Sequence, residues 1–572
     1  MKNINYINKF RSDKVLTSKS IFICSFLLFL LFSSCTKELD LVSEDNITDA
    51  TFWKTGKDFK LAANNLYNGL DRFGFEDTES DIAFNFPNSV SNGSYQLSET
   101  NSQWTTSYNY IRDINIILAK GEGSTDSDVK RFVAEAKFFR AWYYWKLFRI
   151  FGGVPLITKA LDATDPDLYA PRATRQETVD FILKDLDEAV VDLPFKSELN
   201  ASDVGRITKG TVLSFEARVS LFEGTWEKFR NMADAVKYLD KAIQTSSTVI
   251  NSGEYGLYID KGSNSYRYLF LQNGDDSNET ILDRRYQRNV IGHSTPYDYD
   301  GNGYNPTRTL ADLYLDKNGV PITNNMSVFQ GYDTFDSEYI DRDPRMTMTM
   351  IVPGKETVRV FFPETPVVNW PDFPQRNPNT GYILYKYMSE DPELNNSGQE
   401  GDASLFDYDR HLIRYAEVLL IYAEATFEKN DVISDNDLDK SINVIRDRVN
   451  MPHLTNSFVT SNGLDMRTEI RRERTVELAL EGFRYDDLRR WKTAENILPQ
   501  DIKGIKIKGT EWENREPYSL PSFQSRADVD GFLISETNRI FDPNKHYLQP
   551  LPTKEIALYA ENGATLEQNP GW

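Results

Sequence analysis

The sequence predicts a mainly α-helical fold: tetratricopeptide-like helix pairs in an α-superhelical scaffold, carrying a loop-rich subdomain with short β strands. Helices joined by short turns, with small residues such as Ala217 and Ser220 at the crossing points, recur before residue 250 and again after residue 409. This recurrence is typical of tetratricopeptide-like stacking, although no strict repeat register is visible. Between the two blocks the helical period lapses, and fragments such as ETILDRRY and RVFF indicate short strands.

The first thirty-four residues have the composition of a secretory signal. Five basic residues precede the apolar stretch 21–32, and Ser33, Ser34 and Cys35 follow it. The apolar stretch is too short to span a bilayer permanently. A cysteine directly after small residues resembles a bacterial lipobox, although Phe32 stands where a small or aliphatic residue is typical. We expect residues 1–34 to be a lipoprotein signal peptide and residues 35–54 a tether lipidated at Cys35, with ordinary secretion as the alternative.

The composition is that of an acidic, soluble body. The formal net charge is -21, and 40% of the residues are hydrophobic. So acidic a chain is unsuited to nucleic acid or to electrostatic binding of anionic lipid. Cys24 lies within the predicted signal, so the mature chain keeps only Cys35 and has no internal disulfide. Membrane attachment would then depend on the lipid, and no nucleic-acid partner is expected.

Residues 55–250 are expected to form an N-terminal helical part. Phe59, Leu66 and Leu70 mark the first packed helix, and AEAKFFRAWYYWKLFRIFGGVPLI is an aromatic-rich helix that should end at Gly152. The stretch 77–103 is rich in Asn, Ser and Gly and predicts a long irregular surface loop. Loops of this length on a helical scaffold are where binding usually occurs.

Charged residues in the segment 409–491 recur at helical spacing. One helix is expected from Asp409 onward, with Arg414, Glu417 and Glu424 on a narrow strip of an otherwise apolar surface. In a second helix, glutamates recur every four residues and would repel one another unless arginines intervene. We therefore predict a structural ion-pair network, with a catalytic or anion-binding site as the alternative. Its members are Arg414, Glu417, Glu424, Arg446, Glu473, Glu477, Glu481 and Arg484.

No metal site and no cofactor are predicted. Residues 298–303 match the start of a calcium loop, but Thr309 occupies the twelfth position, where a bidentate Glu is needed. An EF-hand is therefore rejected, and a weak oxygen-ligand site remains only as an alternative to an Asn/Gly-rich turn. The four histidines do not form a pattern such as H-E-x-x-H.

Several stretches together resemble the SusD/RagB family of surface lipoproteins. They are AEAKFFRAWYYWKLFRIFGGVPLI, GRITKGTVLSFEARVSLFEG, RDPRM, HLIRYAEVLLIYAEA, IRDRVNMP, IRRERTVELALEGFRYDDLRRW and YLQPLPTKEIALYAENGATLEQNPGW. The resemblance implies residues 251–408 as a loop-rich ligand-binding subdomain and residues 409–572 as a C-terminal SusD-like helical part. It also implies an anchor in the cell outer membrane through Cys35, facing the exterior, and a SusC-like TonB-dependent transporter as partner.

The ligand implied by the resemblance is a glycan or, in the alternative, a peptide. Glycan capture calls for exposed aromatic faces beside amide, carboxylate or guanidinium groups. Three segments fit, and Trp370 is the best single candidate because polar residues and prolines surround it. Packing beneath their own loops is the alternative for the aromatics. The expected contacts are Phe84, Tyr95, Tyr297, Tyr299, Tyr304, Asn369, Trp370, Asp372, Phe373 and Arg376.

A non-catalytic binding protein is the expected function. A secreted glycoside hydrolase would need two carboxyl groups across a cleft, but the regularly spaced acids fall on helices already used in packing. No G-x-S-x-G or C-x-x-C motif occurs. A scaffold that binds only proteins is the remaining alternative.

Overall fold

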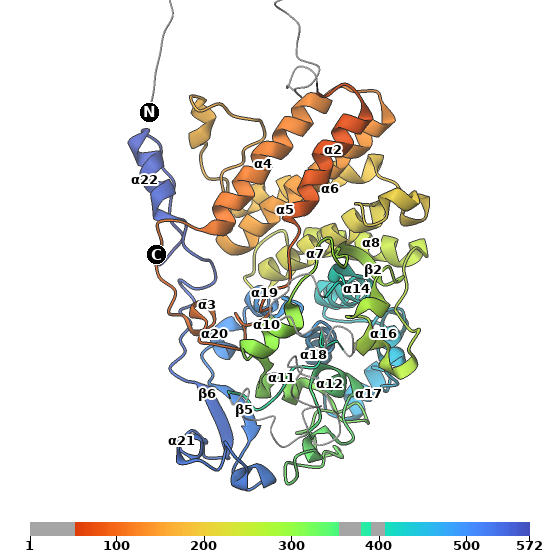
Figure 1. Cartoon of the computed structure of the whole chain (residues 1–572), viewed down its shortest axis with the longest axis vertical. Coiled ribbons are helices and arrows are strands. Elements are labelled where there is room, and N and C mark those ends of the chain that lie inside the picture. Colours follow the sequence, from red (N-terminus) through yellow and green to blue (C-terminus); the bar gives the residue numbers. More distant parts are fainter. Residues whose placement is uncertain (1–51, 354–378, 390–405) are drawn as a thin grey trace, which may run out of the picture. The chain divides into compact units, whose positions relative to one another are not determined.

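The computed structural model describes residues 52–353, 379–389 and 406–572 (Figure 1). Contacts divide the chain into Met1–Asp58 and Phe59–Trp572. The predicted signal, Cys35 and the expected contacts Asn369, Trp370, Asp372, Phe373 and Arg376 lie outside the described residues. Within the described ranges, no helix is long and apolar enough to cross a membrane.

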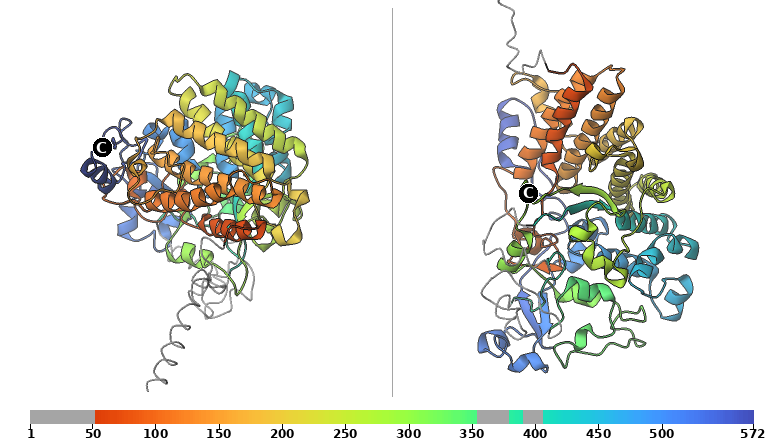
Figure 2. Two further views of the ribbon diagram at one scale, coloured as in Figure 1. Left: turned by 90° about the horizontal axis from the view of Figure 1, so that it is seen from above. Right: turned by 45° about the vertical axis from the view of Figure 1, so that its right-hand side comes forward.

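The N-terminal part of Phe59–Trp572 is a stack of successive helices. The longer ones are α4 (Ser102–Gly121), α5 (Ser127–Phe151), α6 (Arg175–Asp192), α7 (Lys209–Lys228) and α8 (Ala235–Ser252). Each packs on the next, and α14 (Tyr415–Asn430) joins the stack against α7 and α8 (Figure 2). Ala217, Ala242 and Ala425 lie in the shared core of these three helices. Small residues therefore stand at a helix crossing, and the predicted helical, tetratricopeptide-like scaffold is confirmed.

Helix ends follow local chemistry. The side chain of Thr174 caps α6 in a capping box with Glu177. Helix α5 ends at Gly152, whose φ of 75° is costly for residues with a Cβ. The aromatic-rich helix therefore ends at the glycine that the sequence indicated.

The remaining elements are short. The helices are α2 (Gly56–Leu66), α3 (Ser89–Asn92), α9 (Ser265–Tyr268), α10 (Thr295–Gly301), α11 (Arg308–Leu313), α12 (Pro344–Thr349), α15 (Asp435–Asp439), α16 (Ile442–Arg448), α17 (Asn456–Ser461), α18 (Met466–Glu477), α19 (Arg484–Arg490), α20 (Ala494–Ile497), α21 (Pro521–Gln524) and α22 (Thr553–Glu561). Over the described ranges, three two-stranded antiparallel ladders pair β1 (Ala83–Phe84) with β3 (Asn305–Pro306), β2 (Thr280–Arg284) with β4 (Arg410–Arg414), and β5 (Ile502–Lys506) with β6 (Phe532–Glu536).

The helix expected from Asp409 begins later than predicted. Residues Arg410–Arg414 form β4, which pairs with β2, and α14 begins only at Tyr415. Arg414 is the N-cap residue, with an extended φ of -131°. The helical spacing of apolar residues includes Leu412 and therefore predicted a helix there. The segment is instead a strand, because it pairs with β2, more than a hundred residues away in the chain.

The glutamates of the second predicted helix are separated by cations. Glu473 and Glu477 lie on α18, but the helix ends at Glu477, and Leu480 turns the chain with a φ of 65°. Arg345 bonds both Glu473 (2.7 Å) and Glu477 (3.0 Å), and Arg414 bonds both Glu477 (2.7 Å) and Glu481 (2.8 Å). The predicted like-charge repulsion is thus offset by guanidinium groups inserted between neighbouring carboxylates.

We call the connected set of these residues the buried ion cluster. Its cations are Arg345, Arg414, Arg446, Arg448 and Lys386, and its anions are Asp343, Glu279, Glu473, Glu477 and Glu481. Five of each make the cluster neutral. Burial raises the pKa of Glu477, but Arg448, Arg414 and Arg345 outweigh it and hold that pKa below its ordinary value.

The other three residues of the predicted network pair elsewhere. Glu417 accepts from Arg218 of α7 at 2.6 Å, and Glu424 accepts from Arg490 of α19. Arg484 forms a bidentate pair with Asp81 at 2.9 Å. The eight predicted residues therefore all form ion pairs, but in separate groups, because helix α14 turns its carboxylates toward α7 and α19.

Replacing Arg414 by Ala is expected to lower the free energy of unfolding by about 3–5 kcal/mol, because it leaves buried carboxylates uncompensated. Chemical denaturation of the mature chain measures the loss. Arg285→Ala is the control, since Arg285 and its partner Asp276 are largely exposed, at 41% and 56%, and such pairs contribute about 0–1 kcal/mol. Equal losses in the two variants would contradict a stabilising buried cluster.

Candidate functional site

The long loop after α2 carries the candidate site, and polar contacts hold it firmly. The Tyr299 hydroxyl donates to the Gly74 carbonyl (2.7 Å), and the Tyr304 hydroxyl donates to the Glu76 carbonyl (2.6 Å). Asp77 accepts from the backbone N–H groups of Gly482 (3.1 Å) and Arg484 (2.8 Å). The loop therefore has little regular secondary structure but a defined position.

Three of the expected ligand contacts are core residues. Phe84, Tyr299 and Tyr304 are only 6%, 2% and 1% exposed. Phe84 belongs to β1, and the rings of Tyr299 and Tyr304 pack at 4.6 Å from each other. Their expected role as exposed stacking surfaces is wrong, because the loop carbonyls need buried hydroxyl donors and the rings fill the space beneath the loop.

Two other phenylalanines of the same loop are exposed instead. Phe86 is 58% exposed and Phe75 is 36% exposed. Phe75 lies above Tyr299 and Tyr304, with ring centroids 5.8 and 5.7 Å away. Phe86 lies within a segment that the sequence had singled out, and Pro87 directly after it was a sign that the buried strand could not continue. We call Phe75 and Phe86 the aromatic pair.

Tyr95 and Tyr297 are half-buried. The Tyr95 ring meets Trp572 edge-on at 5.9 Å, and Tyr297 lies on α10. Both keep exposed surface, and as ligand contacts they remain predictions. The described chain resumes at Asn379, whose side-chain amide donates to the Asn85 carbonyl at 3.4 Å, next to Phe86.

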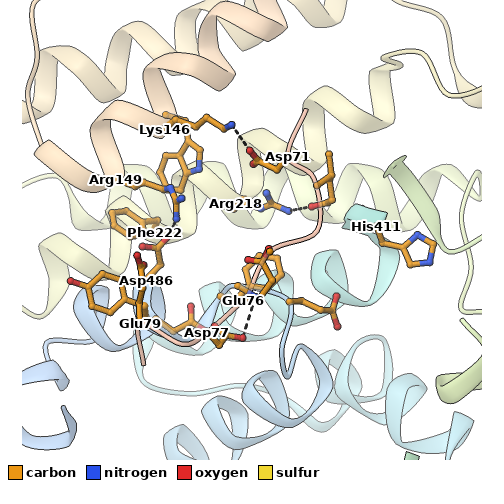
Figure 3. A pocket seen from close by; sticks show the side chains of 18 of the residues that line it. Asp71, Glu76, Asp77, Glu79, Lys146, Arg149, Arg218, Phe222, His411 and Asp486 are labelled. Carbon is orange, nitrogen blue, oxygen red and sulfur yellow. Dashed lines mark hydrogen bonds and ion pairs between the residues drawn. The ribbon is translucent and has the colours of Figure 1, made fainter. Parts of the chain in front are cut away.

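A cavity of about 400 Å³ lies beneath the loop (Figure 3). Lys146 and Arg149 of α5 and Arg218 of α7 face the loop carboxylates Glu76, Asp77 and Glu79 across it. Phe75 also lines the cavity. The aromatic pair and the cavity therefore share one residue.

Most charges in the cavity wall are paired. Lys146 binds Asp71, Arg149 bonds Asp486 at 3.2 Å, and Arg410 bonds Glu76 at 2.7 Å. Burial raises the pKa of Asp77 to about 7 despite its two backbone hydrogen bonds. Burial likewise raises the pKa of Glu79. The carboxylates of the loop are thus unequal: Asp71, Glu76 and Asp81 each pair with a cation, whereas Asp77 accepts only backbone N–H groups.

The possible calcium loop is a helix. Residues Thr295–Gly301 form α10, and Asp298 accepts from the Ser294 hydroxyl at 2.6 Å. Among the described residues, no group of three His, Cys, Asp or Glu side chains is arranged to hold a metal ion. The Asn/Gly-rich stretch of the sequence thus corresponds to the end of a short helix.

His411 of β4 lines the cavity and lies in a group of buried titratable residues that also includes Asp283 of β2 and Asp409, which directly precedes β4. His411 bonds Asp283 (2.8 Å) and the Leu269 carbonyl (2.8 Å). Burial opposes its charge, but Asp283 prevails and raises the pKa of His411 to about 9. Burial and the nearby Asp275 and Asp283 raise the pKa of Asp409 to about 8. Both groups therefore hold protons more tightly in the folded chain than in the unfolded one.

Comparison with known proteins agrees with this architecture. The sequence model of the SusD family matches residues 268–572, more than half of the chain. The protein belongs to the SusD family. A second family model, described as starch-binding and associating with the outer membrane, matches residues 62–221.

Individual SusD-family relatives cover most of the chain. SusD-like protein P38 of Formosa agariphila is 26% identical over 515 residues, which are 82% of this chain and 90% of that protein. The starch-binding protein SusD of Bacteroides thetaiotaomicron is 23% identical over 73% of this chain and 75% of its own. The crystal structure of a SusD-like carbohydrate-binding protein from Bacteroides fragilis is 25% identical, with a TM-score of 0.71 and coverage of 88% of this chain and 98% of that one.

The melting temperature is expected to fall as the pH rises from about 6.5 to 9. Protonated His411 contributes fully to the free energy of unfolding below the unfolded histidine pKa of about 6.5. This contribution is lost as the pH rises through about 9. Asp409, with an unfolded pKa of about 3.9, also destabilises the fold progressively up to about pH 8. Differential scanning calorimetry across this range measures the trend.

Asp409→Asn is expected to flatten this pH dependence. The amide oxygen can still accept the Tyr286 N–H, which Asp409 accepts at 2.6 Å, but it carries no charge to bury. The stability of the variant relative to the parent chain should be greater at pH 9 than at pH 5 by at least about 1 kcal/mol. Parallel stability profiles for the two proteins would show that Asp409 does not contribute to the trend.

Proposed function

We propose that this protein is a non-catalytic lipoprotein of the outer membrane that captures oligo- or polysaccharides at the cell surface. Its lipid anchor is Cys35, it faces the exterior, and it delivers the glycan to a SusC-like TonB-dependent transporter. Membership of the SusD family supports the proposal. Relatives described as starch-binding and as carbohydrate-binding support the ligand class.

The observation that carries glycan binding is the aromatic pair on a rigid loop. Aromatic faces stack on the C–H surfaces of sugar rings, and polar neighbours bond the hydroxyl groups. Asn85 directly precedes Phe86 in sequence, and Arg72, three residues before Phe75, is exposed. Because the loop is held by Tyr299, Tyr304 and Asp77, little ordering cost accompanies binding.

Further contacts are proposed around the aromatic pair. Tyr95 and Tyr297 retain exposed surface on the described part of the chain. In sequence, the expected contacts Asn369, Trp370, Asp372, Phe373 and Arg376 shortly precede Asn379, and Asn379 contacts Asn85. These residues complete the proposed glycan surface.

Phe86→Ala is expected to weaken binding of a retained polysaccharide by about tenfold, because one stacking face is lost. Affinity electrophoresis of the mature chain in gels containing each of a panel of polysaccharides identifies the ligand and measures the loss. Phe195→Ala is the matched control: Phe195 is 38% exposed, but it lies between α6 and α7. Equal retention of the Phe86 and Phe195 variants would place the site elsewhere.

The remaining parts of the proposal have separate tests. Binding of peptides with no retention on any glycan would favour the peptide alternative. Reducing ends released from a bound glycan by the purified protein would show that it is a hydrolase. Cys35→Ala should release the protein from the membrane, and affinity purification of the anchored protein should recover the transporter. Membrane retention of the Cys35 variant would contradict the lipid anchor.

A further inference from the structure

The cavity beneath the loop reaches from the protein surface into the interior of the helix stack. Phe75 and Arg72 line it and are exposed, whereas Trp142 and Arg474 also line it and are each only 3% exposed. Its volume of about 400 Å³ falls within the range of small-ligand sites. A ligand that contacts Phe75 at the surface therefore has space to extend inward beneath the loop.

Two buried donors in the cavity wall have no hydrogen-bond acceptor among the described residues. They are the indole Nε1 of Trp142, on α5, and the guanidinium Nη1 of Arg474, on α18. Buried N–H groups in folded proteins are normally satisfied by a protein, water or ligand acceptor. Because both side chains line the same cavity, acceptor atoms held inside it can supply both missing hydrogen bonds.

The surrounding side chains hold both donors in place. The Trp142 ring packs against Phe215, with centroids 4.9 Å apart. Arg474 bonds Asp487 through Nε at 2.9 Å, and its guanidinium carbon lies 5.4 Å from the Phe483 ring centroid. Donors fixed in this way bind an acceptor at little ordering cost. Because Asp487 already pairs with the Arg474 charge, an uncharged oxygen is sufficient as the missing acceptor.

The chemistry of the wall matches a sugar ring. Besides the two donors, the aromatic residues Trp145, Phe222 and Tyr485 line the cavity. Aromatic surfaces favour the C–H groups of a sugar, and its hydroxyl and ring oxygens are acceptors. Ordered water alone could also satisfy the donors. A sugar hydroxyl can replace such a water without loss of its hydrogen bonds, and the sugar ring adds contact with the aromatic side chains.

We propose that this cavity is an inner subsite that encloses one uncharged sugar residue of the captured glycan, with the Trp142 and Arg474 N–H groups donating to its oxygen atoms. The inference rests on the proposed glycan-capture function. In this arrangement the aromatic pair contacts the part of the glycan that lies outside the cavity, and the inner subsite binds a residue at its end.

The Trp142 donor is tested by NMR of the mature chain, titrated with methyl glycosides of neutral hexoses and pentoses. A glycoside in the cavity should shift the Trp142 indole N–H signal, which Trp142→Phe identifies, because the proton gains an acceptor. The signal of Trp104, which is buried but does not line the cavity, should stay unchanged. No shift with any glycoside would show that the cavity holds only water and would overturn the proposal. An equal shift with glycerol would show a solvent pocket without sugar specificity and would also overturn it.

The Arg474 donor is tested by Arg474→Lys, which keeps a positive charge beside Asp487 but lacks Nη1. The variant should bind the same glycoside about tenfold more weakly in an isothermal titration. Arg472→Lys is the matched control on the same helix, since Arg472 pairs with Glu469 at 3.2 Å and does not line the cavity. Its affinity should equal that of the parent chain. An unchanged affinity in Arg474→Lys, or equal losses in the two variants, would contradict the inner subsite.

Phe86→Ala separates this inference from the proposed function. Phe86 does not line the cavity, so the variant should lose polysaccharide retention but keep the glycoside affinity of the parent chain. Loss of glycoside binding in this variant would place the glycoside on the aromatic pair and overturn the inner subsite. Polysaccharide retention that depends on Phe86, together with no glycoside binding, would overturn the inner subsite alone. Glycoside binding in the cavity with no retention on any polysaccharide would instead count against polysaccharide capture.

Discussion

The arrangement of the helices depends on one buried carboxylate, that of Glu477. Arg345, Arg414 and Arg448 reach it at 3.0, 2.7 and 2.5 Å, from α12, β4 and α16 respectively. The backbone carbonyl of Glu477 also accepts hydrogen bonds from Arg414 and from the Tyr266 hydroxyl. Segments far apart in sequence therefore meet at the end of α18. Because removal of one member leaves an unpaired buried charge, the cluster can form only when all of these segments are in place.

The buried ion cluster also determines where the candidate site lies. Helix α18 ends at Glu477, and the turn that follows presents the backbone N–H groups of Gly482 and Arg484 to Asp77. Arg484 then pairs with Asp81 in the same loop. The loop that carries Phe75 and Phe86 is thus attached to the cluster through a few residues. A surface loop with this support can present aromatic rings in a defined geometry without belonging to a helix or sheet.

Local sequence patterns were sufficient for some features and misleading for others. The crossing of α7, α8 and α14 was predictable because small residues such as Ala217 recur at helical spacing, and Gly152 ended α5 as expected. β4 was missed, since its partner β2 is remote in sequence. Tyr299 and Tyr304 were misplaced because an isolated tyrosine between polar residues has the same local pattern whether its hydroxyl meets solvent or a buried carbonyl.

By itself the sequence determined that Phe59–Trp572 is built from packed helix pairs, that its acids and arginines pair inside the scaffold, and that it resembles the SusD/RagB family. These features follow from periodicity and from motifs, which are local. Only the tertiary structure decided which carboxylate meets which arginine, that Phe75 and Phe86 are exposed rings of the loop, and that Glu79 borders the cavity. The exposure of a side chain and its ion-pair partner depend on segments that are distant in the chain. The pattern of residues within one segment therefore cannot predict them.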